Sequence, residues 1–244
     1  MSRRSELYES LAQYYNYIYS WKNYENDARL LRALIQKHKK SSGSRLLDVA
    51  CGTGKHIQYL KNDFECIGVD ISEQMLAVAR ENLPSIRFIR ANMTDFSLDE
   101  CFDVVTCLFS AIGYLRTRYE IDKAIHNFAK HMKTGGVLII EPWIRKSKWR
   151  DKSVDLQTYD SEELKLARVN YGSMRGNFSI LDEKYLIAEK NKGTKYVKDR
   201  NRMRFFEPEP TLSSMRNAGL DAQFTEESLM HGRGLLIGVR KQGS

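Results

Sequence analysis

An acid and two glycines lie in the stretch of sequence best suited to bind a polar ligand. The run LLDVACGTG at residues 46–54 predicts a buried parallel strand that ends in a glycine turn. Gly52 and Gly54 can take backbone angles that other residues avoid, and they leave room for a ligand against bare backbone. Residues 55–61 predict a helix. A strand, a glycine turn and a helix start together predict a binding site at the carboxyl edge of a sheet.

A second strand supplies another acid. The run CIGVD at residues 66–70 is apolar and ends in Asp70, which can accept hydrogen bonds from ribose hydroxyls. A dinucleotide fingerprint, G-x-G-x-x-G, would need its third glycine at Lys55 or Ile57, so neither register fits. Asp48 would repel a pyrophosphate but suits an α-amino group. The combination favours S-adenosylmethionine over a dinucleotide and disfavours an NAD-dependent dehydrogenase.

Three segments resemble the class I S-adenosylmethionine-dependent methyltransferases: residues 48–54, Asp70 and the run NMTD at residues 92–95. Ala50 stands where that family has its first glycine. The resemblance implies a methyltransferase with S-adenosylmethionine as its cofactor and with no metal. The cofactor contacts that it implies are Tyr15, Tyr24, Asp48, Ala50, Gly52, Gly54, Asp70, Ile71, Met75, Asn92, Met93 and Leu108.

Later segments narrow the resemblance. They are FSAIGYL at residues 109–115, EPW at residues 141–143 and GRGL at residues 232–235. Together they resemble the dTDP-amino-sugar N,N-dimethyltransferases of the desosamine and mycaminose type, and the resemblance covers nearly the whole chain. It implies a nucleotide-linked amino sugar as substrate and a homodimer as the assembly.

The residues expected at the methyl-transfer centre follow the fourth and fifth predicted strands. The carboxyl ends of these strands should carry Phe109, Ser110 and Glu141 to the ligand edge of the sheet. Glu141 could bind the substrate amine or merely cap a turn, and Tyr114 could meet the amine or simply pack. The candidate catalytic residues are Tyr15, Tyr114 and Glu141. The candidate substrate contacts are Phe109, Ser110, Tyr114, Trp143 and Arg233, of which the last could hold a diphosphate bidentately.

The order of predicted elements indicates an α/β fold with a Rossmann-like seven-stranded methyltransferase sheet and a small antiparallel β lobe inserted after strand five. Expected strands are 45–50, 65–70, 86–90, 102–108, 135–141, 221–229 and 235–240. Expected helices are 5–19, 23–39, 55–61, 72–82, 117–132 and 211–218, the last capped by Thr211. The expected parts are 1–143 (helical lid and cofactor core), 144–206 (β lobe, with a hairpin turn at Asp182-Glu183) and 207–244 (completion of the core sheet).

Composition excludes several classes of protein. The hydrophobic fraction of 42% argues against global disorder, and no apolar run is long enough to span a bilayer. Four cysteines without a C-x-x-C pair argue against a zinc site and fit a cytoplasmic protein. The net charge of +8 permits an anionic partner such as a nucleotide, whereas a nucleic acid is disfavoured because no aromatic-interleaved basic motif is present.

The chemistry expected is in-line attack of a neutral amine on the S-methyl carbon, for which orientation matters more than a general base. A second hypothesis keeps the cofactor but gives it another acceptor, either a different small-molecule amine or RNA. A third, from another class, is a cofactor-binding subunit that has lost catalysis.

Overall fold

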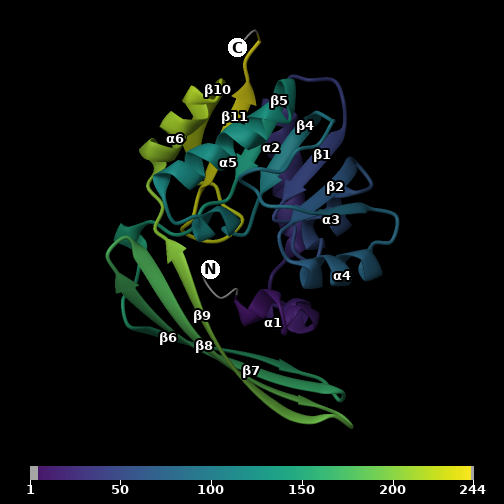
Figure 1. Cartoon of the computed structure of the whole chain (residues 1–244), viewed down its shortest axis with the longest axis vertical. Helices are drawn as coiled ribbons and strands as arrows, with labels where there is room; N and C mark the ends of the chain where they lie inside the picture. Colours follow the sequence, from purple (N-terminus) through teal and green to yellow (C-terminus); the bar gives the residue numbers. More distant parts are fainter. Residues whose placement is uncertain (1–4, 243–244) are drawn as a thin grey trace.

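The computed structural model describes residues 5–242, which form an α/β core and a projecting antiparallel sheet (Figure 1). The core sheet has seven strands in the order β10-β11-β5-β4-β1-β2-β3. This confirms the expected Rossmann-like methyltransferase sheet. The strand bounds are β1 Arg45–Val49, β2 Glu65–Asp70, β3 Arg87–Arg90, β4 Phe102–Cys107, β5 Met132–Ile140, β10 Leu220–Thr225 and β11 Leu235–Arg240.

Parallel pairing of the central strands brings their carboxyl ends to one edge. Strand β1 pairs in parallel with both β2 and β4, with Leu47 opposite Ile67 on one side and Val105 on the other. Strands β10 and β11 run antiparallel and complete the sheet beside β5. Because helices cover both faces, the central strands are mostly apolar, and Leu47 and Val105 are 0% exposed. The turns after β1, β2, β4 and β5 therefore converge at one place.

Local sequence signals set the helix ends. The helices are α2 Tyr24–His38, α3 Lys55–Leu60, α4 Glu73–Asn82, α5 Arg118–Lys130 and α6 Pro208–Asn217. The Ser72 hydroxyl accepts the Met75 N–H at 3.1 Å, as an N-cap should. Helix α6 starts before the expected Thr211, because a proline suits the first helical position, where its missing N–H is not needed. Strand β10 likewise ends at Thr225 rather than at residue 229, since its last pair is Thr225 with Leu235.

The expected helix at residues 5–19 is wrong. The segment instead forms two 3₁₀ turns, η1 Glu6–Tyr8 and η2 Ala12–Tyr14, followed by the short α1 Tyr15–Ile18. Tertiary partners take up its backbone groups: the Ser72 hydroxyl donates to the Tyr8 carbonyl, and the Leu7 N–H donates to Asp199. The segment lies between the core and the projecting sheet and packs against both (Figure 1).

The projecting sheet, which we call the β lobe, follows β5 as expected. Its strands are β6 Ser153–Asp160, β7 Leu164–Arg175, β8 Phe178–Glu189 and β9 Gly193–Arg204, joined in sequence order. The expected hairpin at Asp182-Glu183 is wrong, because β8 runs through it without a break. Cross-strand partners hold both acids in the strand: Asp182 pairs with Arg200, and Glu183 pairs with Arg168. The turns lie instead at Gly176 (φ 62°) and Asn191 (φ 65°).

The remaining 3₁₀ helices are η3 Ala111–Tyr114, which follows β4, and η4 Lys146–Lys148, which precedes the β lobe. Within residues 5–242, no helix is both long enough and apolar enough to cross a bilayer. In the same described part of the chain, no group of three or more His, Cys, Asp or Glu side chains is arranged to hold a metal ion.

Candidate functional site

The turn after β1 curls around an open pocket. Ala50, Gly52 and Gly54 all have positive φ, at 59°, 57° and 75°. Alanine at such an angle costs about 1–2 kcal/mol, which explains why a glycine would be the usual residue there. The cavity volume of this pocket is about 40 Å³. It is lined by Tyr15, Tyr24, Asp48, Ala50, Cys51, Gly52, Thr53, Lys55, His56, Leu108 and Phe109.

Asp48 presents an unmatched acceptor to this pocket. The Thr106 hydroxyl donates to Asp48 Oδ1 at 2.7 Å, while the buried Oδ2 has no hydrogen-bond partner among the described residues. Burial raises the pKa of Asp48 to about 6. A buried carboxylate oxygen without a partner is costly, so a ligand that brings a positive donor would fit this position.

Asp70 joins the turns after β1 and β2. Its Oδ2 accepts the Gly52 N–H at 2.8 Å, and its Oδ1 accepts the Ser72 N–H at 2.9 Å. Burial raises the pKa of Asp70, and the backbone N–H donors oppose that rise by favouring the carboxylate. Each oxygen keeps a lone pair that could accept a ribose hydroxyl. Asp70 therefore fixes the glycine turn even though it does not line the pocket itself.

The other predicted cofactor contacts lie farther round the same edge. Ile71 is 46% exposed immediately after Asp70. Met75 lies close to the turn, since its Cε would be 3.1 Å from a Cβ added at Gly52. Asn92 accepts the Thr94 N–H at 3.1 Å, and Met93 packs at the margin of the core. The roles of these residues toward a cofactor stay predictions.

Two consecutive non-glycine residues after β4 adopt left-handed backbone. Phe109 has φ 51° and Ser110 has φ 64°. Glu141 holds this bend: its Oε2 accepts the Phe109 N–H at 2.7 Å, and its backbone carbonyl accepts the Ser110 N–H at 3.2 Å. The Ser110 hydroxyl donates to the Pro142 carbonyl at 2.7 Å. Strain of this kind gathers at functional sites, where the surrounding structure enforces it.

Glu141 is 0% exposed, so its observed contacts are those of a turn cap. A direct contact between Glu141 and a substrate amine stays a prediction. The hydrogen bond to Phe109 N–H gives the carboxylate a positioning function, because Phe109 lines the pocket.

Arg233 points into the site from the loop between β10 and β11. Its Nη1 donates to the Ser110 hydroxyl at 2.8 Å and lies 4.0 Å from Glu141 Oε1. The guanidinium also lies over the rings of Trp143 at 4.8 Å and Phe109 at 5.5 Å. Burial lowers the pKa of Arg233, and the Glu141 carboxylate opposes that change. The structure thus brings together all the predicted substrate contacts except Tyr114.

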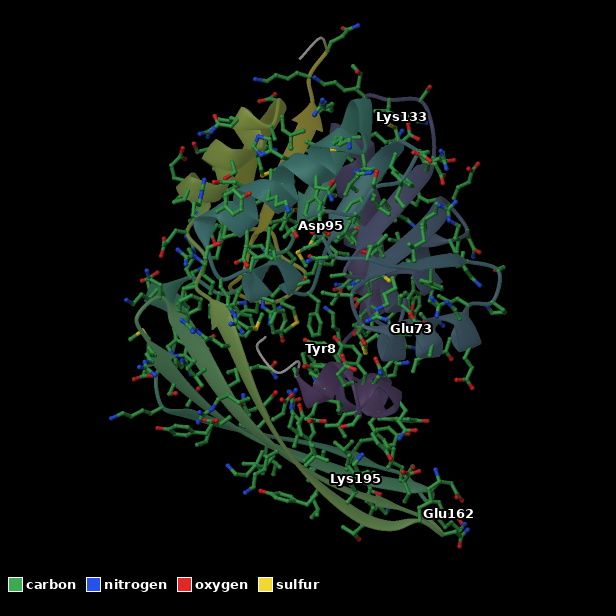
Figure 2. The ribbon with its side chains drawn as sticks, in the orientation of Figure 1. Tyr8, Glu73, Asp95, Lys133, Glu162 and Lys195 are labelled. Carbon is green, nitrogen blue, oxygen red and sulfur yellow. The ribbon has the colours of Figure 1, made fainter. Side chains whose placement is uncertain are left out.

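Tyr114 lies in a neighbouring tyrosine cluster. Its hydroxyl is 2.7 Å from that of Tyr8, which sits where the N-terminal segment meets the core and the β lobe (Figure 2). The ring of Tyr15 lies 6.1 Å from Tyr8 and 4.7 Å from Tyr19, and the Tyr19 ring meets Phe109 edge-on at 5.0 Å. Burial raises the pKa of each of these four tyrosines, so all remain neutral phenols at physiological pH.

Sequence reasoning missed the polar residues that the β lobe adds to this cluster. The Tyr114 hydroxyl donates to Asn201 Oδ1 at 3.4 Å, and Asn201 Nδ2 donates to Glu183 Oε2 at 2.6 Å. Arg168 donates to the Tyr19 hydroxyl at 3.0 Å and lies 3.3 Å from Glu183. The signal for these residues in the sequence was a polar side chain at an inward position of β7, β8 and β9.

Sequence reasoning also missed a charged cluster beside the pocket. Lys22 Nζ lies 2.6 Å from Asp27 Oδ2, and His56 Nε2 lies 3.1 Å from the same oxygen. Lys22, Asp27 and His56 are 7%, 2% and 6% exposed. Asp27 lies on the buried face of α2 with Ala28 and Leu31. An acid on the apolar face of a helix was the signal in the sequence that could have indicated this cluster. Lys22 lies just outside any helix and gave none.

A second open pocket lies on the other side of the 109–113 bend. Its cavity volume is about 180 Å³, and it has both aromatic and basic walls. Its lining includes Ile112, Gly113, Arg118, Trp143, Lys146, Arg204, Phe205 and Phe206. Trp143 lines this larger pocket and also lies against the Arg233 guanidinium.

Known proteins with similar sequences are methyltransferases, which agrees with the cofactor site described above. A family profile described as a methyltransferase domain matches residues 46–136. The chain is 33% identical over 232 residues to dTDP-3-amino-3,6-dideoxy-alpha-D-glucopyranose N,N-dimethyltransferase of Streptomyces fradiae, covering 94% of this chain and 90% of that protein.

Two solved structures also resemble this chain over most of its length. DesVI of Streptomyces venezuelae superimposes with a TM-score of 0.85 at 31% identity, covering 91% of this chain and 97% of that one. CalS10, an amino pentose methyltransferase from Micromonospora echinaspora solved with S-adenosylmethionine bound, gives a TM-score of 0.81 at 28% identity, covering 99% of both chains. The chain therefore belongs to the class I S-adenosylmethionine-dependent methyltransferases and closely resembles the dTDP-amino-sugar N,N-dimethyltransferases.

Proposed function

We propose that this methyltransferase acts on the amino group of a dTDP-linked amino sugar. The observation that carries the proposal is the position of Arg233. Its side chain is 12% exposed, and its guanidinium is held by Ser110 next to Phe109, which lines the proposed cofactor pocket. An arginine that is buried this far and still has free N–H donors suits a diphosphate. The names of the similar N,N-dimethyltransferases support the same substrate class.

The larger pocket supports a nucleotide as the remainder of the substrate. Trp143 and Phe205 offer aromatic surfaces, and Lys146 and Arg204 offer positive charge. A base could stack on such a ring while a phosphate meets the cations. The diphosphate would then lie at Arg233, with the sugar between it and the cofactor pocket.

Bound S-adenosylmethionine would supply a methyl group on a sulfonium, already activated for transfer. The amine lone pair forms the new N–C bond as the C–S bond breaks, and the amine then loses one proton to water. The chain has to orient the amine and keep it unprotonated. Tyr15, as a neutral phenol in the pocket wall, can accept a hydrogen bond from the amine. Tyr114 and Glu141 are the other candidates for this role.

The test combines binding with turnover. The melting temperature should rise with S-adenosylhomocysteine and rise again with added thymidine diphosphate, because each ligand stabilises the folded protein by mass action. Mass spectrometry should then find a methylated product from a dTDP-amino sugar. Arg233→Met should abolish the second rise and keep the first. If thymidine diphosphate has no effect, the acceptor is another amine or RNA. If no amine is methylated at all, the cofactor-binding subunit becomes the better hypothesis.

The raised pKa of Asp48 predicts how cofactor binding depends on pH. With a pKa of about 6, against about 3.9 in the unfolded chain, the carboxyl is neutral at pH 5 and charged at pH 7. For the free protein this lowers stability as the pH rises from about 4 to 6. A ligand ammonium binds only the charged form, so S-adenosylhomocysteine should bind more tightly as the pH rises from 5 to 7, by up to about tenfold per pH unit.

Calorimetric titration across this pH range would measure the effect. Asp48→Asn should flatten the dependence, and 5′-methylthioadenosine, which lacks the amino group, should show a flat dependence with the unchanged protein. Equal pH dependence for both ligands would contradict contact between Asp48 and the amino group.

We also propose a homodimer, and the outer face of the β lobe is the surface that supports it. Large apolar side chains lie exposed there on paired strands, including Leu156 at 62%, Val169 at 50% and Leu186 at 52%. An exposed apolar patch of this kind is typical of an interface. Sedimentation equilibrium should give twice the chain mass of 28.4 kDa, and Leu186→Lys should give the monomer.

A further inference from the structure

Two acids fix the direction of a buried amide in the β lobe. Asn201 is 3% exposed, and its Nδ2 donates to Glu183 Oε2 at 2.6 Å and to Asp199 Oδ2 at 3.4 Å. A carboxylate oxygen only accepts hydrogen bonds, so the NH₂ group of the amide has to face the two acids. The carbonyl oxygen of the same amide, Oδ1, therefore faces the hydroxyl of Tyr114.

Other groups hold both acids in place. Arg168 lies 3.3 Å from Glu183, and its positive charge favours the carboxylate, although burial raises the pKa of Glu183. The Leu7 N–H donates to Asp199 Oδ2 at 3.1 Å. A flipped Asn201 amide would place Oδ1 against two acceptors and lose both hydrogen bonds, which is costly in a buried position. Only one orientation of the amide is therefore stable.

The fixed amide sets the direction of the Tyr114 hydroxyl. Asn201 Oδ1 can only accept, so at 3.4 Å it takes the Tyr114 proton. The Tyr8 hydroxyl lies 2.7 Å from that of Tyr114, and because the Tyr114 proton is already used, Tyr8 is the donor in this pair. A phenol oxygen has two lone pairs, and Tyr8 uses one of them. Tyr114 thus offers a ligand one lone pair and no proton.

This direction matters because Tyr114 belongs to the tyrosine cluster beside the cofactor pocket. The Tyr8 ring lies 5.6 Å from the Tyr114 ring and 6.1 Å from that of Tyr15, which lines the pocket. A neutral amine attacks the methyl group through its lone pair. A hydroxyl that donates to this lone pair would block the attack, whereas a hydroxyl that accepts an amine N–H leaves the lone pair free and helps to aim it.

We propose that Asn201 is a positioning residue for methyl transfer. It turns the Tyr114 proton away from the substrate, so that Tyr114 accepts an N–H of the amine. Glu183 and Asp199 act through Asn201 by holding its amide. The inference rests on the proposed function, because it requires an amine as the acceptor. The bonds that form and break are those already described, and the proton that the amine loses still goes to water.

The competing explanation is purely structural, with Asn201 only joining β9 to β8. Turnover of a dTDP-amino sugar by Asn201→Leu, Tyr114→Phe and the double variant separates the two explanations. Asn201→Leu leaves the Tyr114 proton free to donate to the amine, so kcat should fall about tenfold while KM does not rise. Tyr114→Phe should lose only about threefold, because it removes the acceptor and the blocking donor together. The double variant should match Tyr114→Phe, so the second substitution restores activity.

Two further variants control for packing and stability. Asn170→Leu is the same substitution on the same face of the β lobe, since Asn170 lies opposite Glu183, and its Oδ1 has no hydrogen-bond partner among the described residues. It should keep the kcat of the unchanged protein. Asn201→Asp keeps an acceptor for the Tyr114 proton. Its kcat should stay within about threefold of normal, while a third acid beside Glu183 and Asp199 lowers the melting temperature.

The structural explanation predicts different results. Normal kcat in Asn201→Leu, a double variant less active than either single variant, or equal losses of turnover in Asn201→Asp and Asn201→Leu would each overturn the proposal. Binding of S-adenosylhomocysteine shows that each variant is folded, and Asn201→Ala replaces Asn201→Leu, with the same expectations, if the latter is not. If the unchanged protein methylates no dTDP-amino sugar, the proposed function itself fails, and this inference fails with it.

Discussion

Replacing Asp70 with alanine is expected to weaken the binding of S-adenosylhomocysteine by about 100-fold or more, an effect larger than that of any single change among the residues that line the pocket. The carboxylate holds the N–H groups of Gly52 and Ser72 at 2.8 and 2.9 Å and keeps lone pairs for the ribose. Its removal leaves two donors unmatched and frees a turn that has positive φ at Gly52 and Gly54. Titration calorimetry would measure the loss.

Asp95 provides the matched control. It lies in the loop after β3 (Figure 2), and its side chain is 56% exposed and forms a long 3.8 Å ion pair with Lys123. Asp95→Ala should bind S-adenosylhomocysteine as the unchanged protein does. An Asp70→Ala protein that is folded and binds within about threefold of normal would refute the role assigned to this carboxylate.

Replacing Glu141 with alanine is expected to lower the free energy of unfolding by about 3 kcal/mol. The change leaves the Phe109 N–H without its acceptor, at a residue whose backbone is already strained, and leaves Arg233 without its nearby carboxylate. Glu141→Gln keeps an acceptor for Phe109 and should lose less. Urea denaturation of both variants would test whether Glu141→Ala loses more unfolding free energy than Glu141→Gln.

Turnover then distinguishes positioning from direct catalysis by Glu141. A positioning function predicts that Glu141→Gln keeps measurable turnover with an unchanged pH profile, since the amide still holds the bend. A direct contact with the amine predicts near-complete loss of turnover in a protein of normal stability. Glu226→Ala is the control, because that carboxylate is 61% exposed in its pair with Arg145 and should affect neither quantity.

Local pattern was sufficient for much of the fold. The apolar run of β1, its glycine turn and the terminal acid of β2 belong to one strand–helix–strand stretch of the sequence, so their arrangement at one sheet edge could be predicted from strand and turn chemistry. The Ser72 cap and the alternation within the β lobe are signals of the same short range. The strained backbone at Ala50 was also foreseeable, because Ala50 stands where the family has a glycine, and its φ of 59° is an angle that favours glycine.

The wrong expectations lie where distant partners replaced local ones. Residues 5–19 have a helical spacing of apolar side chains, yet Ser72 and Asp199 bind backbone groups that a helix would use. Asp182-Glu183 looks like a turn in isolation, but Arg168 and Arg200 keep both residues in β8.

The sequence by itself determined the class of cofactor site, because β1, its glycine turn and the acid that ends β2 are local signals within one strand–helix–strand stretch. Only the tertiary structure decided which partners hold the charged groups in and around that site. Lys22 meets Asp27 and His56, Glu141 holds Phe109, and Arg233 reaches Ser110. The physical reason is burial: folding removes these groups from water beside their partners. Lys22 and His56, Phe109 and Glu141, and Ser110 and Arg233 each come from distant segments, so no single segment specifies such a contact.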